Sequence, residues 1–147
     1  MELLKPSIKK ALPSWNKQVH GETDALVFCE QKRIFTKDTD LIDDLGEYRV
    51  HREKPCILLH SYIEKSYRAW VYFHEIGHFI LHPTECAQFS DAVTRRKIEK
   101  EAHFVAAVAL IPTFILKKMR LEEIQEEFGY PRRLILLRKV IYDNYKI

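Results

Sequence analysis

Hydrophobic and polar positions alternate at two different periods along the chain, and the change between them falls near residue 61. Before that point the apolar runs are short and are separated by polar, turn-like residues, a pattern typical of strands. We expect one short N-terminal helix in residues 1–24, followed by a small sheet in residues 25–60. Four segments are the strand candidates: ALVFCE, RIFTKD, GEYRVH and CILLH.

After residue 61 apolar side chains recur at helical spacing. The pattern predicts a long helix over 61–82, stopped by Pro83, and a second helix over 93–111 with an apolar stripe facing the core. Three shorter helical pieces are expected in 113–147. The chain therefore predicts a single α+β domain over 1–147, in which a small antiparallel or mixed sheet of three or four strands precedes a helical core.

Composition and charge narrow the possible functions. The 147 residues include 24 basic and 21 acidic side chains, and this near balance provides no strong field for gathering nucleic acid. The three cysteines form no C-x-x-C pair, which favours reduced thiols in a cytosolic protein. Neither a signal-peptide core nor an apolar run of membrane-spanning length is present in the sequence. We expect a cytoplasmic protein without a membrane partner.

The stretch FHEIGHFILHP carries the candidate chemistry. His74, Glu75 and His78 satisfy H-E-x-x-H, which places two imidazoles on one face of a helix, where both can reach one zinc ion. Glu75 can then act as general base toward a water in the open coordination position. Gly77 costs helix propensity, which indicates that another element packs closely against the backbone there.

Catalytic zinc needs a third protein ligand, and the histidine spacing does not supply it. His82 lies eight residues from His74, a helical rise of about 12 Å, so we expect it to bond the last carbonyls of the helix instead. Glu99 and Glu101 on the second helix are the alternatives. Glu101 is favoured because it shares the core-directed face with Val105.

Taken together, these motifs resemble the zinc metallopeptidases of the ImmA/IrrE type. The matching segments are DDLGEYRV, YRAWVYFHEIGHFILHP, EKEAHFVAAVALIP and LEEIQEEFGYPRRLILLR, which span residues 41–138. The resemblance implies one catalytic Zn²⁺ held by His74, His78 and Glu101, with Glu75 as general base. It places Arg68 on the family's arginine before the motif, and His103 stands where the family usually has Asn.

The resemblance also implies a function: cytoplasmic cleavage of a protein substrate, a DNA-binding repressor, in stress responses or mobile-element control. The strand CILLH is expected to be the edge on which a substrate segment pairs. Candidates for stabilising the oxyanion are His60, Tyr62 and His103.

Two other functions compete with proteolysis. The segment LEEIQEEFGYPRRLILLRKV has a helix-turn-helix outline whose Arg132, Arg133, Arg138 and Lys139 could meet DNA phosphates, but its apolar run indicates burial, so direct nucleic-acid binding is not expected. The second competing function is that of a zinc-stabilised regulatory module, which binds a repressor without cutting it. In that case Cys86 could close the metal site.

Overall fold

The computed structural model describes residues 14–41, 43–83 and 91–147, so most of the expected N-terminal helix and Cys86 lie outside the described residues. Its elements follow in the order α2 (Glu22–Gln31), β1 (Phe35–Thr39), β2 (Gly46–His51), β3 (Lys54–His60), α3 (Lys65–Leu81), α4 (Ala92–Leu110), α5 (Thr113–Lys118), α6 (Leu121–Phe128) and α7 (Arg132–Tyr145). A three-stranded sheet with helix α2 before it and helices α3 to α7 after it makes an α+β fold, as predicted.

The first predicted strand is wrong, because ALVFCE lies inside helix α2. The helix start is fixed by Asp24, whose carboxylate accepts a hydrogen bond of 2.8 Å from the backbone N–H of Gly21. Ala25 and Cys29, four positions apart, are buried on one face. Tertiary packing of that face therefore outweighs the strand-like composition of the run.

The sheet has the strand order β1-β3-β2, with β1 parallel and β2 antiparallel to β3. A two-residue turn joins β2 to β3, and both of its residues, Arg52 and Glu53, have positive φ. The strand CILLH belongs to β3, which is hydrogen-bonded on both sides. The prediction that it forms the substrate-pairing edge is therefore wrong, and β2 is the edge next to the motif helix.

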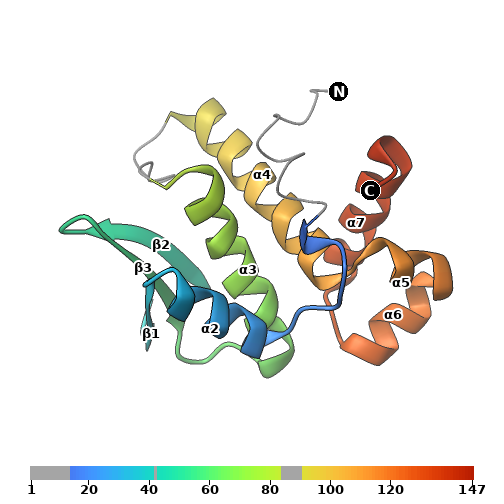
Figure 1. The fold of residues 1–147 in the computed structure, drawn as a ribbon, viewed down its shortest axis with the longest axis horizontal. Coiled ribbons are helices and arrows are strands. Elements are labelled where there is room, and N and C mark those ends of the chain that lie inside the picture. Colours follow the sequence, from blue (N-terminus) through green and yellow to red (C-terminus); the bar gives the residue numbers. More distant parts are fainter. Residues whose placement is uncertain (1–13, 42, 84–90) are drawn as a thin grey trace.

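Helix α3 lies between the sheet and α4, and helices α5 to α7 lie beyond α4 (Figure 1). This position explains why α3 is buried on nearly every side. A β-carbon on Gly77 would stand 3.0 Å from the Cα and 3.1 Å from the carbonyl oxygen of Ala102. The predicted close approach at Gly77 is therefore confirmed, and its partner is the backbone of α4.

The C-terminal helices enclose a buried arginine. Arg138 donates hydrogen bonds to the carbonyl oxygen of Ile147 (2.6 Å), to Oγ1 of Thr113 (3.1 Å) and to the carbonyl oxygen of Ile111. Its side chain is fully buried, which removes it from any contact with DNA phosphates.

Among the described helices, none is both long and apolar enough to cross a bilayer.

Candidate active site

Three side chains from two helices converge at the middle of α3. Nε2 of His74 lies 3.2 Å from Nε2 of His78 and 2.8 Å from Oε2 of Glu99. Oε1 of Glu99 lies 3.1 Å from Nε2 of His78. The H-E-x-x-H spacing brings the two imidazoles together on one helix face, and the antiparallel helix α4 adds a carboxylate.

These donors fit a zinc ion by their chemistry and their separation. Tetrahedral coordination at 2.0–2.1 Å separates two ligand atoms by roughly 3.3 Å, close to the distances in this cluster. Two imidazole nitrogens and one carboxylate are also the donor set of a catalytic zinc site that keeps one position open. His74, His78 and Glu99 are thus the residues that could hold a metal.

The structure brings Glu99, and not Glu101, to the two histidines. The side chain of Glu99 is 39% exposed at the cleft wall, whereas that of Glu101 is 9% exposed and points into the core. The preference for Glu101 assumed that the ligand shares the core-directed face of Val105. That assumption fails because the donor cluster opens toward solvent, so the required face of α4 is the one directed at the cleft.

Glu101 has a different neighbour. Its Oε2 lies 3.1 Å from Nε2 of His82, and both side chains are buried. This contact links the C-terminal end of α3 to α4, and the expected role of His82 as a cap on the last carbonyls of the helix stays a prediction. The structure thus places Glu99 beside His74 and His78 and places Glu101 beside His82, although the two glutamates are only two positions apart.

The protonation states in the cluster suit cation binding. Burial lowers the pKa of His74, with Glu99 opposing the shift. Burial acts to raise the pKa of Glu99, but its hydrogen bonds with His74 and His78 outweigh burial and hold that pKa well below its usual range. At neutral pH the cluster therefore presents a neutral imidazole at His74 and a charged carboxylate, the forms that bind metals.

Glu75 lies beside the cluster, against strand β2. A β-carbon on Gly46 would stand 3.2 Å from Oε1 of Glu75 and 2.4 Å from Cγ1 of Val71, so only glycine allows this approach of the strand. Burial, and then the charges of Glu99, Asp44 and Glu47, raise the pKa of Glu75 well above its usual value. A carboxylate of raised pKa is a stronger base, which suits proton abstraction at neutral pH.

A cleft of about 540 Å³ contains all four of these side chains. One wall is formed by the segment from Asp43 to Tyr48, which includes the start of β2, and the other by α3, α4 and the first turn of α7. Among the described strands, β2 has a neighbour on one side only, and its first residues, Gly46 to Tyr48, line the cleft. An extended peptide could pair there with its backbone next to Glu75.

Of the three oxyanion candidates, only His103 lines the cleft. Its ring centroid lies 4.3 Å from that of His74, and one donor atom from each of His74, Glu99 and His103 falls within 4.8 Å of the others. His78 remains the better third donor, because its Nε2 lies 3.2 Å from Nε2 of His74 and 3.1 Å from Oε1 of Glu99. Burial and the neighbouring His74 lower the pKa of His103 to about 4.

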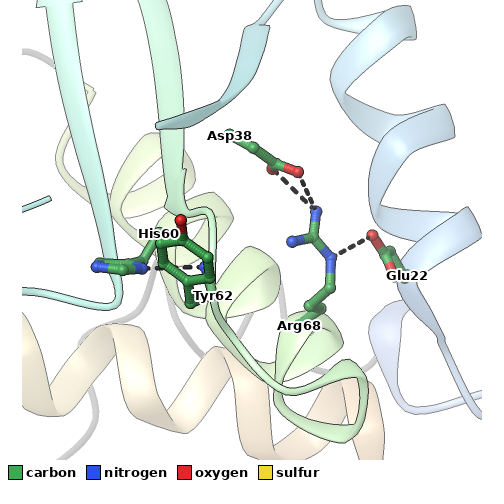
Figure 2. Close-up of polar contacts among 5 residues, drawn as sticks. All are labelled: Glu22, Asp38, His60, Tyr62 and Arg68. Atoms are coloured by element: carbon green, nitrogen blue, oxygen red, sulfur yellow. Dashed lines mark hydrogen bonds and ion pairs between the residues drawn. The ribbon is translucent and has the colours of Figure 1, made fainter. Parts of the chain in front are cut away.

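Figure 2 shows where the remaining predicted residues lie. Nδ1 of His60 accepts a 3.1 Å hydrogen bond from the backbone N–H of Tyr62 at the end of β3. Arg68 donates to Glu22 at 2.8 Å and to Asp38 at 3.0 Å, which joins α3 to α2 and β1. Arg68 therefore links three elements of the fold and does not line the cleft.

Sequence reasoning missed the wall of the cleft on the α7 side. Arg133, assigned above to possible DNA contacts, lies over the ring of Trp70 at 4.7 Å and lines the cleft together with Arg95. No local signal in the sequence connects residue 133 to residue 70. Gly46 did carry a signal, since a glycine inside a strand indicates close approach of another backbone or ligand.

Comparisons with known proteins agree with this fold. The sequence profile of the IrrE N-terminal-like domain, Peptidase_M78, matches residues 30–138. A solved Mycobacterium tuberculosis transcriptional regulator has a similar fold, with a TM-score of 0.59 at 13% identity over 92% of this chain. This chain spans 55% of the length of that structure. A search of curated proteins gives no significant match. From the profile match over most of its length, this chain belongs to the IrrE N-terminal-like domain family, Peptidase_M78.

Proposed function

We propose that this protein is a zinc-dependent endopeptidase. The observation that carries the proposal is the convergence of His74, His78 and Glu99 within 3.2 Å of one another beside the buried Glu75. Membership of a peptidase family and the open edge of β2 in the same cleft support it.

His74, His78 and Glu99 would hold the metal, and the remaining residues divide the other tasks. Bound zinc supplies Lewis-acid polarisation of a scissile carbonyl. The edge of β2 binds the substrate backbone in extended form and orients it along the cleft. The Glu75 carboxylate takes a proton from the attacking water and returns it to the nitrogen of the leaving amine.

The raised pKa of Glu75 has a physical consequence for this role. The neighbouring charge of Glu99 contributes to the shift, so neutralising Glu99 by a bound cation would lower the pKa of Glu75. A cation bound at Glu99 would therefore favour the ionised, proton-accepting form of Glu75.

We extend the proposal to the substrate class, a DNA-binding repressor cleaved in the cytoplasm. The family resemblance supports this choice, as does the fold shared with a protein described as a transcriptional regulator. Direct DNA binding by this chain is disfavoured, because Arg138 is buried and Lys139 is paired with Asp143. A regulatory module that binds a repressor without cutting it predicts the same metal site but no role for Glu75.

The substitution Glu75→Gln separates the peptidase from the non-catalytic module. Glutamine keeps the size of the side chain but cannot accept the proton, so we expect proteolysis of a candidate repressor to fall by at least about a hundredfold. Zinc content should stay unchanged, because Glu75 is not one of the three donors. Cleavage is followed by mass spectrometry of the products.

Two outcomes would count against this proposal. Cleavage that persists in Glu75→Gln at the wild-type rate would contradict the assignment of the general base. Wild-type protein that carries zinc and binds the repressor, but never cuts it, would favour the regulatory module.

A further inference from the structure

The wall of the cleft opposite β2 is basic and aromatic. His103 of α4 contacts His74, and Trp70 of α3 lies next to His103, with ring centroids 4.3 Å and 5.9 Å apart in these two pairs. The guanidinium of Arg133 then covers the ring of Trp70 at 4.7 Å. A continuous row of side chains therefore leads from the metal donors to an arginine at the start of α7.

Arg133 is exposed, and its guanidinium lies over the ring of Trp70. Stacking on an aromatic face holds a guanidinium in place while its N–H groups remain available at the edge of the plane. Among the described residues, no acidic side chain forms an ion pair with Arg133 or with Arg95, although both line the cleft. These two cations therefore have unused capacity to bind an anion.

We propose that this wall is a carboxylate-binding subsite, in which Arg133, positioned by Trp70 and assisted by His103, receives an acidic side chain or a free C-terminus of the bound peptide. The proposal rests on the proposed zinc-peptidase function and defines the substrate class more closely. Arg133 would select substrates with a carboxylate near the scissile bond. It is a specificity residue and does not touch the reacting atoms.

The opposite wall excludes a larger anion. Asp43, Asp44 and Glu47 line the cleft on the side of β2, and Glu99 of α4 lines the other wall beside the two histidines. Their negative charges would repel a nucleic-acid backbone or a polyphosphate along most of the cleft. A single carboxylate on an otherwise neutral or basic peptide avoids that repulsion, and it matches the planar fork of a guanidinium.

His103 can add one hydrogen bond to such a ligand. Its Nδ1 is buried and has no hydrogen-bond partner, while the half-buried residue lines the cleft. The other ring nitrogen, Nε2, is then the one left to face the cleft. As a neutral imidazole with its proton on Nε2, His103 would donate to the carboxylate beside Arg133.

Binding of blocked amino acids to the zinc-loaded full-length protein tests this subsite without any cleavage. The probes are N-acetyl-glutamate N-methylamide, which has only a side-chain carboxylate, N-acetyl-alanine, which has only a terminal carboxylate, and the neutral N-acetyl-glutamine N-methylamide. NMR shifts of the Trp70 indole N–H report binding next to Arg133. We expect the better of the two carboxylates to bind about tenfold more tightly than the neutral probe.

Substitutions in the first turn of α7 provide the controls. Arg133→Gln should reduce the ratio to about one, and Arg133→Lys should keep part of it, because the charge remains while the planar fork is lost. Arg132→Gln is the matched control, since Arg132 is exposed and does not line this cleft. Thermal melting checks that each variant is folded.

The result that overturns the subsite is a wild-type ratio near one, or a ratio that survives Arg133→Gln. Because the readout is binding, these outcomes are independent of whether Glu75→Gln abolishes proteolysis. If N-acetyl-alanine is preferred, the subsite receives a free C-terminus. A preference for the glutamate probe assigns it to an acidic side chain.

Discussion

Glu99 and Glu101 stand two positions apart on α4 and have different surroundings. Glu99 reaches the histidine pair at the cleft wall, and Glu101 is buried against His82. A partly exposed carboxylate can exchange its imidazole contacts for a metal at little cost to the fold. Removing the buried carboxylate of Glu101 takes a polar neighbour away from the buried imidazole of His82.

We therefore predict that Glu101→Ala and Glu99→Ala differ in stability. Glu101→Ala should lower the free energy of unfolding by about 2 kcal/mol, because a buried partner of His82 is lost. Glu99→Ala should change it by about 0.5 kcal/mol or less in the absence of metal, since the side chain is partly exposed. Urea denaturation with a chelator present measures both, and equal losses would contradict the assignment.

At the scale of elements, the crossing of α3 and α4 positions the donor cluster. Gly77 permits it, because a β-carbon there would meet the backbone of Ala102 at 3.0–3.1 Å. Backbone atoms cannot rotate away as a side chain can. The separation of the two helices is therefore set at the middle of the metal-binding motif.

Gly77→Ala should destabilise the protein although alanine is the better helix former. The gain in propensity is about 1 kcal/mol, and overpacking costs about 1–3 kcal/mol, so we expect a net loss of about 1 kcal/mol in the free energy of unfolding. Gly21→Ala is the control, because nothing lies within 4 Å of a β-carbon at that position. A more stable Gly77→Ala variant would show that the helices can separate freely.

Local signals explain which elements were predictable. These signals are the helical repeat of apolar positions in α3, the stop at Pro83, and Gly129 and Pro131 between α6 and α7. Each acts within one or two helical turns, and the helices that they delimit were predicted correctly. The run ALVFCE misled because burial of Ala25 and Cys29 depends on distant neighbours. The choice of Glu99 over Glu101 likewise depends on how α4 crosses α3, which no local pattern encodes.

At the scale of the whole molecule, metal binding should couple to stability. A ligand present at about 100 times its dissociation constant stabilises the native state by about 2.7 kcal/mol, provided that it binds only the native state. For a chain of this length we expect zinc to raise Tm by about 5–10 °C at pH 7. Scanning calorimetry with zinc and with a chelator measures the shift.

The same shift should depend on pH in a defined direction. Burial lowers the pKa of His74, so this donor is neutral at pH 7 and zinc displaces no proton from it. As pH falls through the lowered pKa, protons compete with zinc, and the rise in Tm should disappear. A shift that grows toward acid pH would contradict imidazole ligation.

The most direct test of the metal site is the zinc content of the purified full-length protein, measured by plasma mass spectrometry for wild type and three variants. We predict about one zinc per chain in wild type and in Glu101→Gln, and loss of zinc in His78→Ala and Glu99→Gln. Glutamine preserves the size of each side chain, so Glu99→Gln and Glu101→Gln form a matched pair. Zinc lost in Glu101→Gln and retained in Glu99→Gln, or a wild-type protein that cannot be loaded at neutral pH, would contradict the site described above.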